Sequence, residues 1–294
     1  MAIPLVGDAG GGTLDHIQAL RPRLMSVAYR ILGSVVDAED AVQDAFLRLH
    51  TAHDVRSPEG FLIRTTTRRC IDKLRSDNRR ESYIGPWVPE PVDTSASSNN
   101  ANLDESLSLG FLLMLERLSP VERAAFVLRT VFDYEYSEIA DVLEKSELHV
   151  RKIVSRAKEH LSIDTPRFRP TREKANELAE QFVAACRAGD AKLVEQFLTD
   201  DVEVYSDGGG KVTAARVVIR GRERVARFLA KVFHTKRRDY DMLPAVVNGA
   251  PGVVFTLAGK VVHVASVRVE DGVSGVYMCL NPEKLAHWSV AKLN

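Results

Sequence analysis

The chain has 294 residues, of which 45% are hydrophobic and 27% charged, and its 40 acidic side chains balance 40 basic ones. This composition is typical of a soluble globular protein with two or three domains. No segment approaches the roughly 18 consecutive apolar residues of a membrane span, and the first residues lack the positive charges of an export signal. We therefore expect a cytoplasmic protein with no membrane partner. The zero net charge does not exclude nucleic acid as a partner, because charges act locally, within a Debye length of roughly 8 Å.

Three cysteines, Cys70, Cys186 and Cys279, lie far apart in apolar stretches. Their odd number and wide separation indicate buried thiols in a reducing compartment rather than a disulfide or a metal site. Redox sensing through one of them is the alternative. We expect no metal and no cofactor.

The segment up to Gly12 is rich in glycine, and we expect it to be disordered. From Leu14 to Leu32 apolar residues recur with the period of a helix, and Gly33 follows where a helix C-terminus is expected.

The next helical pattern covers Asp37 to His50. Its apolar face consists of Ala38, Ala41, Val42, Ala45, Phe46 and Leu49. Its opposite face, which we expect to be exposed, carries Glu39, Asp40, Gln43, Asp44 and Leu47.

A third helix is predicted from Phe61 to Asn78, after a start signal at Ser57-Pro58-Glu59. Its predicted buried positions are Ile63, Thr67, Cys70, Ile71 and Leu74. Its outward positions are basic: Arg64, Arg68, Arg69, Lys73 and Arg75. A phosphate backbone attracts the basic helix and repels the acidic one. We therefore expect DNA to be the partner of the basic helix and a protein to be the partner of the acidic helix. The three helices form a predicted bundle, the domain of residues 1–80.

Residues 81–102 change in character, from the apolar, proline-rich YIGPWVPEP to a polar run of serine and asparagine. A plain linker is one interpretation. Burying an aromatic side chain is worth about 1.5–3 kcal/mol, however, and we therefore predict that Tyr83 and Trp87 dock onto another domain.

A second all-helical domain is predicted for residues 103–165. A helix over 103–118 is followed by Ser119-Pro120, which marks the start of another helix. The short link between helical patterns at 136–143 and 147–161 is typical of a helix-turn-helix. Ala140 is small where the two helices cross, and Glu144 stands where many such motifs have glycine. The inner face of the last helix is Val150, Ile153, Val154, Ala157 and Leu161. The predicted DNA-binding residues are Ser146, Glu147, His149, Arg151, Lys152, Ser155 and Arg156.

Residues 171–294 read as an α+β domain, with helices first and a curved antiparallel sheet after them. Helices are expected from Ala175 to Cys186, from about 190 to 198, and from Arg222 to Phe233. Strands are expected at 202–205, 240–247, 252–257, 261–269 and 273–280, with tight turns at Asn248-Gly249 and Asp271-Gly272.

Three side chains in this half could serve acid–base chemistry: Asp207, His263 and Tyr277. An aspartate before three glycines is also what a tight turn needs, and a lone histidine in a strand is usually structural. No combination of nucleophile, base and orienting group is present in the sequence. We therefore predict no catalytic site.

The segments DAEDAVQDAFLRLH and SPEGFLIRTTTRRCIDKLRSDNRR resemble the sigma-two domain of extracytoplasmic-function (ECF) sigma factors. The resemblance implies that the first helix binds a coiled coil of the β′ subunit of RNA polymerase core, and that the basic helix opens the minus-ten element of promoter DNA. The implied polymerase-binding residues are Asp40, Ala41, Val42, Gln43, Asp44 and Leu47, and the implied minus-ten residues are Arg64, Arg68, Arg69, Lys73 and Arg75.

The segment LSPVERAAFVLRTVFDYEYSEIADVLEKSELHVRKIVSRAKEHL resembles a sigma-four domain, which implies recognition of the minus-thirty-five element. The last domain resembles the SnoaL-like cone fold. Four segments, YIGPWVPEP, DGGGK, NGAPG and NPEKL, resemble the ECF group that carries such a domain behind sigma-four. The resemblance implies that this domain regulates the sigma domains in cis, in place of a separate anti-sigma protein. Our candidate regulatory contacts are Trp87 in the linker and the loop residues Asp207, Gly208, Gly209, Gly210 and Lys211.

The leading hypothesis is therefore a non-enzymatic sigma factor with a pocket for an unidentified small ligand in its last domain. One alternative is a helix-turn-helix regulator with a ligand-sensing or vestigial cyclase-like domain. Another is an enzyme with a DNA-binding head. Only the first hypothesis explains an acidic face at Asp40 and Asp44, and it predicts that Asp44→Lys abolishes binding to polymerase while leaving the fold intact.

Overall fold

The computed structural model describes residues 16–77, 83–95, 106–161, 170–236 and 239–292. The glycine-rich segment predicted to be disordered lies outside these ranges. The chain divides into two compact units. The first combines Met1–Asn78 with Met114–Ile163, and the second combines Arg79–Leu113 with Asp164–Asn294. The predicted linker thus belongs to the same unit as the C-terminal half of the chain.

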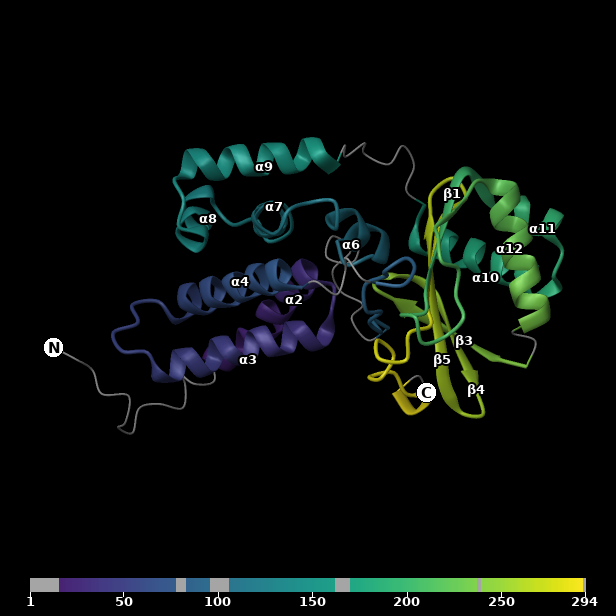
Figure 1. Ribbon diagram of the computed structural model, residues 1–294, viewed down its shortest axis with the longest axis horizontal. Coiled ribbons are helices and arrows are strands. Elements are labelled where there is room, and N and C mark those ends of the chain that lie inside the picture. Colours follow the sequence, from purple (N-terminus) through teal and green to yellow (C-terminus); the bar gives the residue numbers. More distant parts are fainter. Residues whose placement is uncertain (1–15, 78–82, 96–105, 162–169, 237–238, 293–294) are drawn as a thin grey trace. The chain divides into compact units, whose positions relative to one another are not determined.

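The first unit contains the helices α2 (Arg21–Leu32), α3 (Val35–Thr51) and α4 (Pro58–Ser76) (Figure 1). The helix predicted from Leu14 to Leu32 is interrupted by a turn at Leu20. Gly33 ends α2 with a left-handed backbone, at φ 67°. Ser34 and Ser57 cap α3 and α4, each accepting a backbone N–H with its hydroxyl. Local signals in the sequence therefore account for the ends of these helices.

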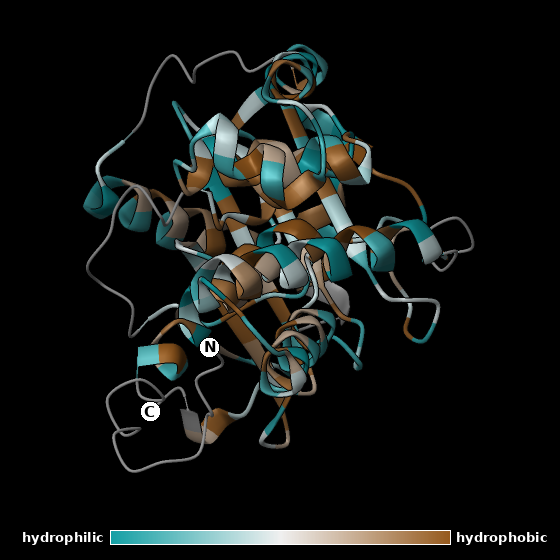
Figure 2. Cartoon of the chain, turned by 90° about the vertical axis from the view of Figure 1, so that its left-hand side faces the viewer, coloured by the Kyte–Doolittle hydropathy of each residue, from teal (hydrophilic) through white to brown (hydrophobic). Residues whose placement is uncertain are grey.

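The predicted apolar faces of these helices form the core of the first unit. Val27, Ala38, Val42 and Leu62 are completely buried. In Figure 2 the helices carry alternating hydrophilic and hydrophobic bands, the pattern of amphipathic helices. Three residues predicted to be buried are only half-buried, because they lie at the edges of the apolar stripes: Phe46, Leu49 and Leu74.

Most of α6 (Leu109–Leu115) belongs to the second unit, and its last two residues belong to the first. The first unit continues with α7 (Pro120–Phe126), a π-helical turn at Val127–Val131, α8 (Tyr136–Leu143) and α9 (Glu147–Leu161). α6 is shorter than the predicted helix, since the chain turns at 116–118. Ser119 and Glu122 form a capping box at the start of α7. Arg123 on α7 is buried and donates hydrogen bonds to Ile31 O at 3.1 Å and to Glu116 at 2.7 Å. This side chain joins the two helical groups into one unit.

The second unit contains helices α10 (Arg172–Ala188), α11 (Ala191–Glu195) and α12 (Arg222–Lys236), the strands β1 (Leu198–Asp207), β2 (Ile219–Arg220), β3 (Asp241–Val247), β4 (Ala250–Leu257), β5 (Lys260–Val269) and β6 (Val273–Cys279), and a 3₁₀ turn at Val290–Lys292. The strand order is β2-β1-β6-β5-β4-β3. The pairs are antiparallel as predicted except β1 with β6, which is parallel. Strands β3 to β6 follow one another as an antiparallel meander, and β1 pairs with β6, the last strand of that meander. The prediction of a purely antiparallel sheet was therefore wrong at this pair.

Each face of this sheet is covered by a different part of the chain. Helices α10 and α12 pack on one face, around Phe182, Leu229 and Met278 (Figure 1). On the other face Val88 of the linker and Trp288 of the C-terminal tail are buried with residues of the sheet. This is the predicted α+β fold, with the linker as one of its layers.

The turn between β4 and β5 was not predicted. Ala258 and Gly259 both have positive φ angles, 51° and 74°, as a two-residue hairpin loop of type I′ requires. A left-handed backbone costs an alanine about 1–2 kcal/mol, and asparagine tolerates it better. We expect Ala258→Asn to stabilise the sheet by about 0.5–1 kcal/mol, measured from hydrogen exchange of β4 and β5 amides. The control is Ala250→Asn, in β4, which should give no gain.

Candidate functional site

The first candidate surface is a stripe along α3. Asp40 and Gln43 are exposed, and two large apolar side chains on the same side of the helix are more than half exposed, Val36 at 57% and Leu47 at 61%. Positions 36, 40, 43 and 47 follow the helical repeat, so they share one face. Exposed apolar side chains beside an acid indicate a protein-binding surface. We call these four residues the α3 stripe.

Two residues predicted to bind the same partner do not lie on this surface. Ala41 is 6% exposed and Val42 is completely buried, because both belong to the apolar face that packs in the core. They support α3 from inside and offer no side-chain surface to a partner.

The predicted acidic and basic faces also meet each other. Asp44 contacts Arg69 at 2.8 Å and Arg48 at 3.0 Å, and Asp37 contacts Lys73 at 2.8 Å. The predicted acidic and basic faces are therefore not separate at Asp44, Arg69 and Lys73, since α3 and α4 neutralise part of each other's charge. Asp44 is not a freely exposed acid, and its replacement by lysine would set a third cation beside two arginines.

Arg68, predicted to bind DNA, is held by the helix-turn-helix. Its side chain donates hydrogen bonds to Val142 O at 2.9 Å and Asp141 O at 3.4 Å, and it pairs with Glu144 at 2.9 Å. These acceptors lie at the C-terminal end of α8, where backbone carbonyls lack helical partners. Arg68 therefore links the two helical groups in this conformation. Arg64, by contrast, is exposed on α4.

The helix-turn-helix has the predicted geometry. Glu144 adopts a left-handed backbone, at φ 52°, at the position where the sequence lacks the usual glycine. Ser146 caps α9 by accepting the N–H of His149 at 3.3 Å. All five predicted inner residues of α9 are buried, and every predicted DNA-binding residue of the motif is exposed.

One exposed arginine of α9 is already ordered. Arg151 pairs with Glu147 at 2.6 Å, and its guanidinium lies 4.2 Å from the centre of the Tyr136 ring. These contacts hold the planar group at the start of the helix that such motifs insert into the major groove. The guanidinium is therefore partly pre-ordered on the exposed face of α9.

In the second unit the predicted docking of Tyr83 and Trp87 is confirmed, and Asp207 is its centre. This carboxylate is completely buried at the end of β1. It accepts hydrogen bonds from the Tyr83 hydroxyl at 2.6 Å and from Val88 N–H at 2.8 Å, and from Gly209 N–H at 3.0 Å. The first two bonds hold the linker, and the third closes the glycine turn. Both interpretations of this aspartate, as a turn residue and as a linker contact, are therefore correct.

Lys284 of the NPEKL segment completes this site. Its ammonium donates to Asp207 at 2.7 Å and to Val88 O at 2.6 Å, and it lies 4.2 Å from the centre of the Trp87 ring. Burial lowers the pKa of Lys284, while the Asp207 carboxylate acts in the opposite direction. Burial and the hydrogen bond to Asp207 raise the pKa of the Tyr83 hydroxyl, which therefore stays protonated and donates.

The linker then pairs with the free edge of the sheet. Thr94 N–H donates to Val246 O at 2.9 Å, and Asn248 N–H donates to Val92 O at 2.9 Å. The Asn248 side chain accepts from Val92 N–H at 2.8 Å. This pairing covers the C-terminal end of β3, the edge strand, and satisfies backbone groups that would otherwise face water. Asn248 belongs to the NGAPG segment, and its left-handed backbone (φ 54°) opens the turn to β4.

The tail fixes the linker at a third point. Trp288 Nε1–H donates to Pro91 O at 2.9 Å. Asn281 donates to the Tyr83 hydroxyl at 3.0 Å, and a side chain at Gly209 would collide with the Asn281 amide. All three sequence segments, DGGGK, NGAPG and NPEKL, therefore contribute to holding the linker. We call this set of contacts the linker clasp. Sequence reasoning missed Asn248, Asn281, Lys284 and Trp288 as its members, although the first three lie in segments that it had singled out.

Comparisons with known proteins show the family to which this chain belongs. Residues 16–80 match the family Sigma-70 region 2, and residues 108–161 match Sigma-70, region 4. The ECF RNA polymerase sigma factor SigJ of Mycobacterium tuberculosis is 38% identical over 92% of this chain and 92% of its own length. This chain is an ECF RNA polymerase sigma factor. The crystal structure of SigJ matches with a TM-score of 0.75 and 31% identity, over 93% of this chain and 98% of that one. A probable ECF sigma factor of the same species, SigI, is 29% identical over 91% of this chain and 93% of its own length.

As an ECF sigma factor, the protein binds core RNA polymerase and directs transcription initiation at promoters. Its relatives are initiation factors and not enzymes, which confirms the prediction of a non-enzymatic protein. The second unit has the predicted SnoaL-like fold behind the sigma domains. Membership of this family decides against both alternative hypotheses.

The three candidate acid–base residues of this sigma factor, Asp207, His263 and Tyr277, make structural contacts. Asp207 holds the linker, and Tyr277 packs with Val88 and Trp288 on the same face. His263 is buried and stacks on Phe255, with 4.4 Å between ring centres. The described residues include no group of three or more His, Cys, Asp or Glu placed to hold a metal ion.

The three cysteines are free and buried, as predicted. Burial raises the pKa of each thiol, that of Cys186 to about 12. A protonated, buried thiol is a poor nucleophile, which argues against the redox-sensing alternative. Within the described ranges no helix is long and apolar enough to cross a membrane.

Proposed function

We propose that the α3 stripe binds the β′ coiled coil of core polymerase, and that α4 and α9 bind the minus-ten and minus-thirty-five elements. The first assignment is supported by the exposure of Leu47 and Val36 beside Asp40, an apolar and acidic combination suited to a protein partner. The second is supported by the uninterrupted exposed face of α9, with Lys152, Arg156 and the ordered Arg151. Because polymerase works on the chromosome, the proposed location is the cytoplasm.

In this assignment Arg68 must leave α8 before it can reach DNA. Its three contacts with the end of α8 occupy its guanidinium. Promoter binding would then exchange these contacts for contacts with phosphate or bases. The Arg68–Glu144 pair is partly exposed, so breaking it costs little free energy, and contacts with DNA can replace it.

The helix-turn-helix assignment predicts two distinguishable arginine effects. We expect Arg156→Ala to weaken binding to every duplex and to lower the salt dependence by about one ion, as loss of a phosphate contact does. We expect Arg151→Ala to cost about 1–3 kcal/mol on the cognate promoter alone, as loss of a base contact does. Fluorescence anisotropy on cognate and scrambled duplexes at several salt concentrations measures both, with Arg117→Ala, outside α9, as the control. Equal losses on both duplexes for Arg151→Ala would contradict the base contact.

We further propose that the SnoaL-like unit regulates the sigma domains in cis by holding the linker. The observation that carries this proposal is the buried Asp207 carboxylate, whose hydrogen bonds to Tyr83 and to Val88 N–H attach the linker. A linker held in this way cannot follow a different path between the sigma-two and sigma-four helices. Release of the linker changes the distance that the two tethered DNA-binding groups can span. It therefore alters the effective concentration of one group at its promoter element once the other group is bound.

The experiment is run-off transcription with core polymerase from a cognate promoter. Wild type is compared with Trp87→Ala and with Tyr83→Phe, which remove linker groups and leave the interior of the SnoaL-like unit unchanged. A change in yield supports regulation through the linker, and unchanged yield for both variants contradicts it. A truncation after about residue 172 is less informative, because it exposes Val88 and Leu109, which are buried in the second unit.

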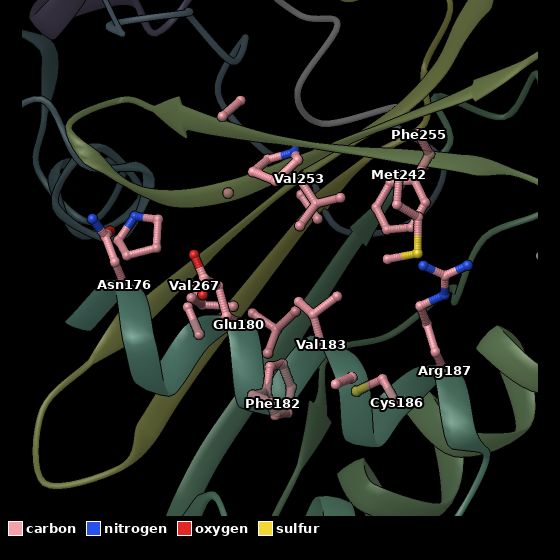
Figure 3. Close-up of a pocket in the computed structure, with 18 of the residues that line it drawn as sticks. Asn176, Glu180, Phe182, Val183, Cys186, Arg187, Met242, Val253, Phe255 and Val267 are labelled. Carbon is pink, nitrogen blue, oxygen red and sulfur yellow. The ribbon is translucent and has the colours of Figure 1, made fainter. Parts of the chain in front are cut away.

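A small-molecule ligand in the SnoaL-like unit is the last part of the proposal. The unit contains a cavity of about 470 Å³ between α10, α12 and the sheet (Figure 3). This volume lies within the range of ligand pockets. The cavity opens on the face of the sheet opposite Tyr277, so Asp207 and Tyr277 do not line it.

A further inference from the structure

The linker forms part of the wall of this cavity. Ser95, the last described linker residue before position 106, lines it together with Val246 and Pro251 of the β3–β4 hairpin. The Ser95 hydroxyl accepts the Val246 N–H at 3.3 Å, and Val246 O accepts the Thr94 N–H at 2.9 Å. One strand residue therefore contacts both the cavity and the linker.

The lining shows which chemistry the cavity accepts. Its floor is formed by apolar side chains of the helices and the sheet, including Phe182, Leu229, Phe255 and Met278. The polar side chains among the described lining residues are Ser95, Asn176, Glu180 and Arg187, each exposed or half-exposed. In Figure 3, Asn176, Glu180 and Arg187 project from α10, while Met242, Val253 and Phe255 face them from the sheet. A charge on the floor would have no partner, so an apolar molecule with polar atoms only at the rim fits best.

We propose that an uncharged, largely apolar small molecule binds in this cavity and that its binding and the attachment of the linker to β3 stabilise each other. This inference rests on the proposed regulation through the linker. When the linker leaves, Ser95 leaves the wall and the Val246 N–H and C=O lose their partners. The cavity then opens to water beside β3, and an apolar ligand loses contact area.

Because such coupling is reciprocal, it can be measured from either side. At saturation, a ligand that binds more tightly when the linker is attached must lower the equilibrium constant for detachment of the linker by the same factor. Typical coupling between sites changes affinity by about 5-fold to 150-fold.

The probe for the first measurement is N-phenyl-1-naphthylamine, a neutral aromatic fluorophore that brightens in apolar surroundings. We expect the full chain to bind it saturably. Val183→Trp and Met242→Trp fill the cavity from the helix side and from the sheet side, and each should abolish binding. Gln181→Trp, on the exposed face of α10, is the matched control and should bind normally. Equal binding by the filled variants and the control would overturn the cavity as the site.

The second measurement tests the coupling. Thr94→Val removes the hydroxyl that donates to Val246 O at 3.2 Å and accepts the Gly249 N–H at 2.8 Å. We expect it to weaken probe binding at least about fivefold. Thr199→Val, which removes a hydroxyl bonded to Asp201 on β1, should have no effect. In wild type, saturating probe should slow hydrogen exchange of the Thr94 and Asn248 amides by the coupling factor. This factor is the ratio of the probe affinities with the linker attached and with the linker detached.

The outcomes separate the two proposals. Equal probe affinity for Thr94→Val and Thr199→Val, with unchanged exchange at Thr94 and Asn248, would overturn the coupling even if the cavity binds the probe. Run-off transcription of the linker variants Trp87→Ala and Tyr83→Phe tests the regulatory role of the linker independently of any ligand. Failure of that test leaves the binding and exchange measurements interpretable.

Discussion

Replacing Asp207 with alanine is expected to release the linker and to lower the free energy of unfolding of the second unit by about 3–5 kcal/mol. The carboxylate is fully buried and bonded to Tyr83, to the Val88 backbone and to Lys284. Its removal leaves the Lys284 cation buried without its carboxylate, and this orphaned charge accounts for most of the cost. Chemical denaturation followed by tryptophan fluorescence measures the stability, because Trp87 and Trp288 both lie in this unit.

A second substitution separates the stability effect from the linker effect. Lys284→Met in the Asp207→Ala background removes the orphaned cation and should restore part of the stability, but it cannot restore the bonds to Tyr83 and Val88. Limited proteolysis of the linker reports its release in both variants. Asp201→Ala, an exposed position on the same strand, is the control and should leave stability and cleavage unchanged. A linker in Asp207→Ala that resists protease as well as in wild type would contradict the clasp.

The stability of Asp207→Ala should depend on pH, and it should rise with pH. Burial already lowers the pKa of Lys284, and without Asp207 that pKa falls further. The unfolded chain then holds more protons than the folded chain at pH values between this lowered pKa and the ordinary lysine pKa of about 10.4. Stability therefore rises with pH as the pH approaches that value from neutrality. Denaturation of Asp207→Ala at pH 7 and pH 9.5 should show the gain, and Asp207→Ala with Lys284→Met should show none from this site.

Asp40→Lys is expected to weaken binding to core polymerase by at least about 30-fold, equivalent to the roughly 2 kcal/mol or more of an interface hot spot. Asp40 is exposed in the middle of the α3 stripe, between Val36 and Leu47, so a lysine there meets a partner with the wrong sign. The fold should be unaffected, unlike with Asp44→Lys, which would disturb the contacts to Arg48 and Arg69. Surface plasmon resonance with immobilised core polymerase measures the affinity.

The matched control is Glu39→Lys. It makes the same change of charge on the neighbouring residue, which is exposed but points about 100° away from Asp40 around the helix. If both lysine variants lose the same affinity, the effect belongs to net charge, and the α3 stripe is not the binding surface. Leu47→Ala adds a charge-neutral measurement and should also weaken binding, because it removes an exposed apolar contact of the stripe.

Much of this protein could be predicted from local patterns. The period of the apolar residues identified both helical groups and the helix-turn-helix, because an amphipathic helix must bury one face whatever it packs against. Serine caps and Gly33 marked helix ends, since the groups that satisfy a helix end lie within a few residues of it. The cost of leaving Trp87 in water was enough to predict that the linker docks.

The partners of individual side chains depended on the tertiary structure. Arg68, Arg69 and Asp44 occupy the predicted helix faces, yet contacts with other helices take up much of their charge. Asp207 and Tyr83 are 124 residues apart, and only the sheet brings them together. Periodicity shows which face of an element turns inward, but it carries no information about what that face meets. The amino-acid sequence by itself therefore determined most of the helices and strands and which face of each turns inward. The tertiary structure alone decided which charges neutralise each other, where the linker attaches and which face of the sheet encloses the cavity, because these depend on contacts between residues far apart in the chain.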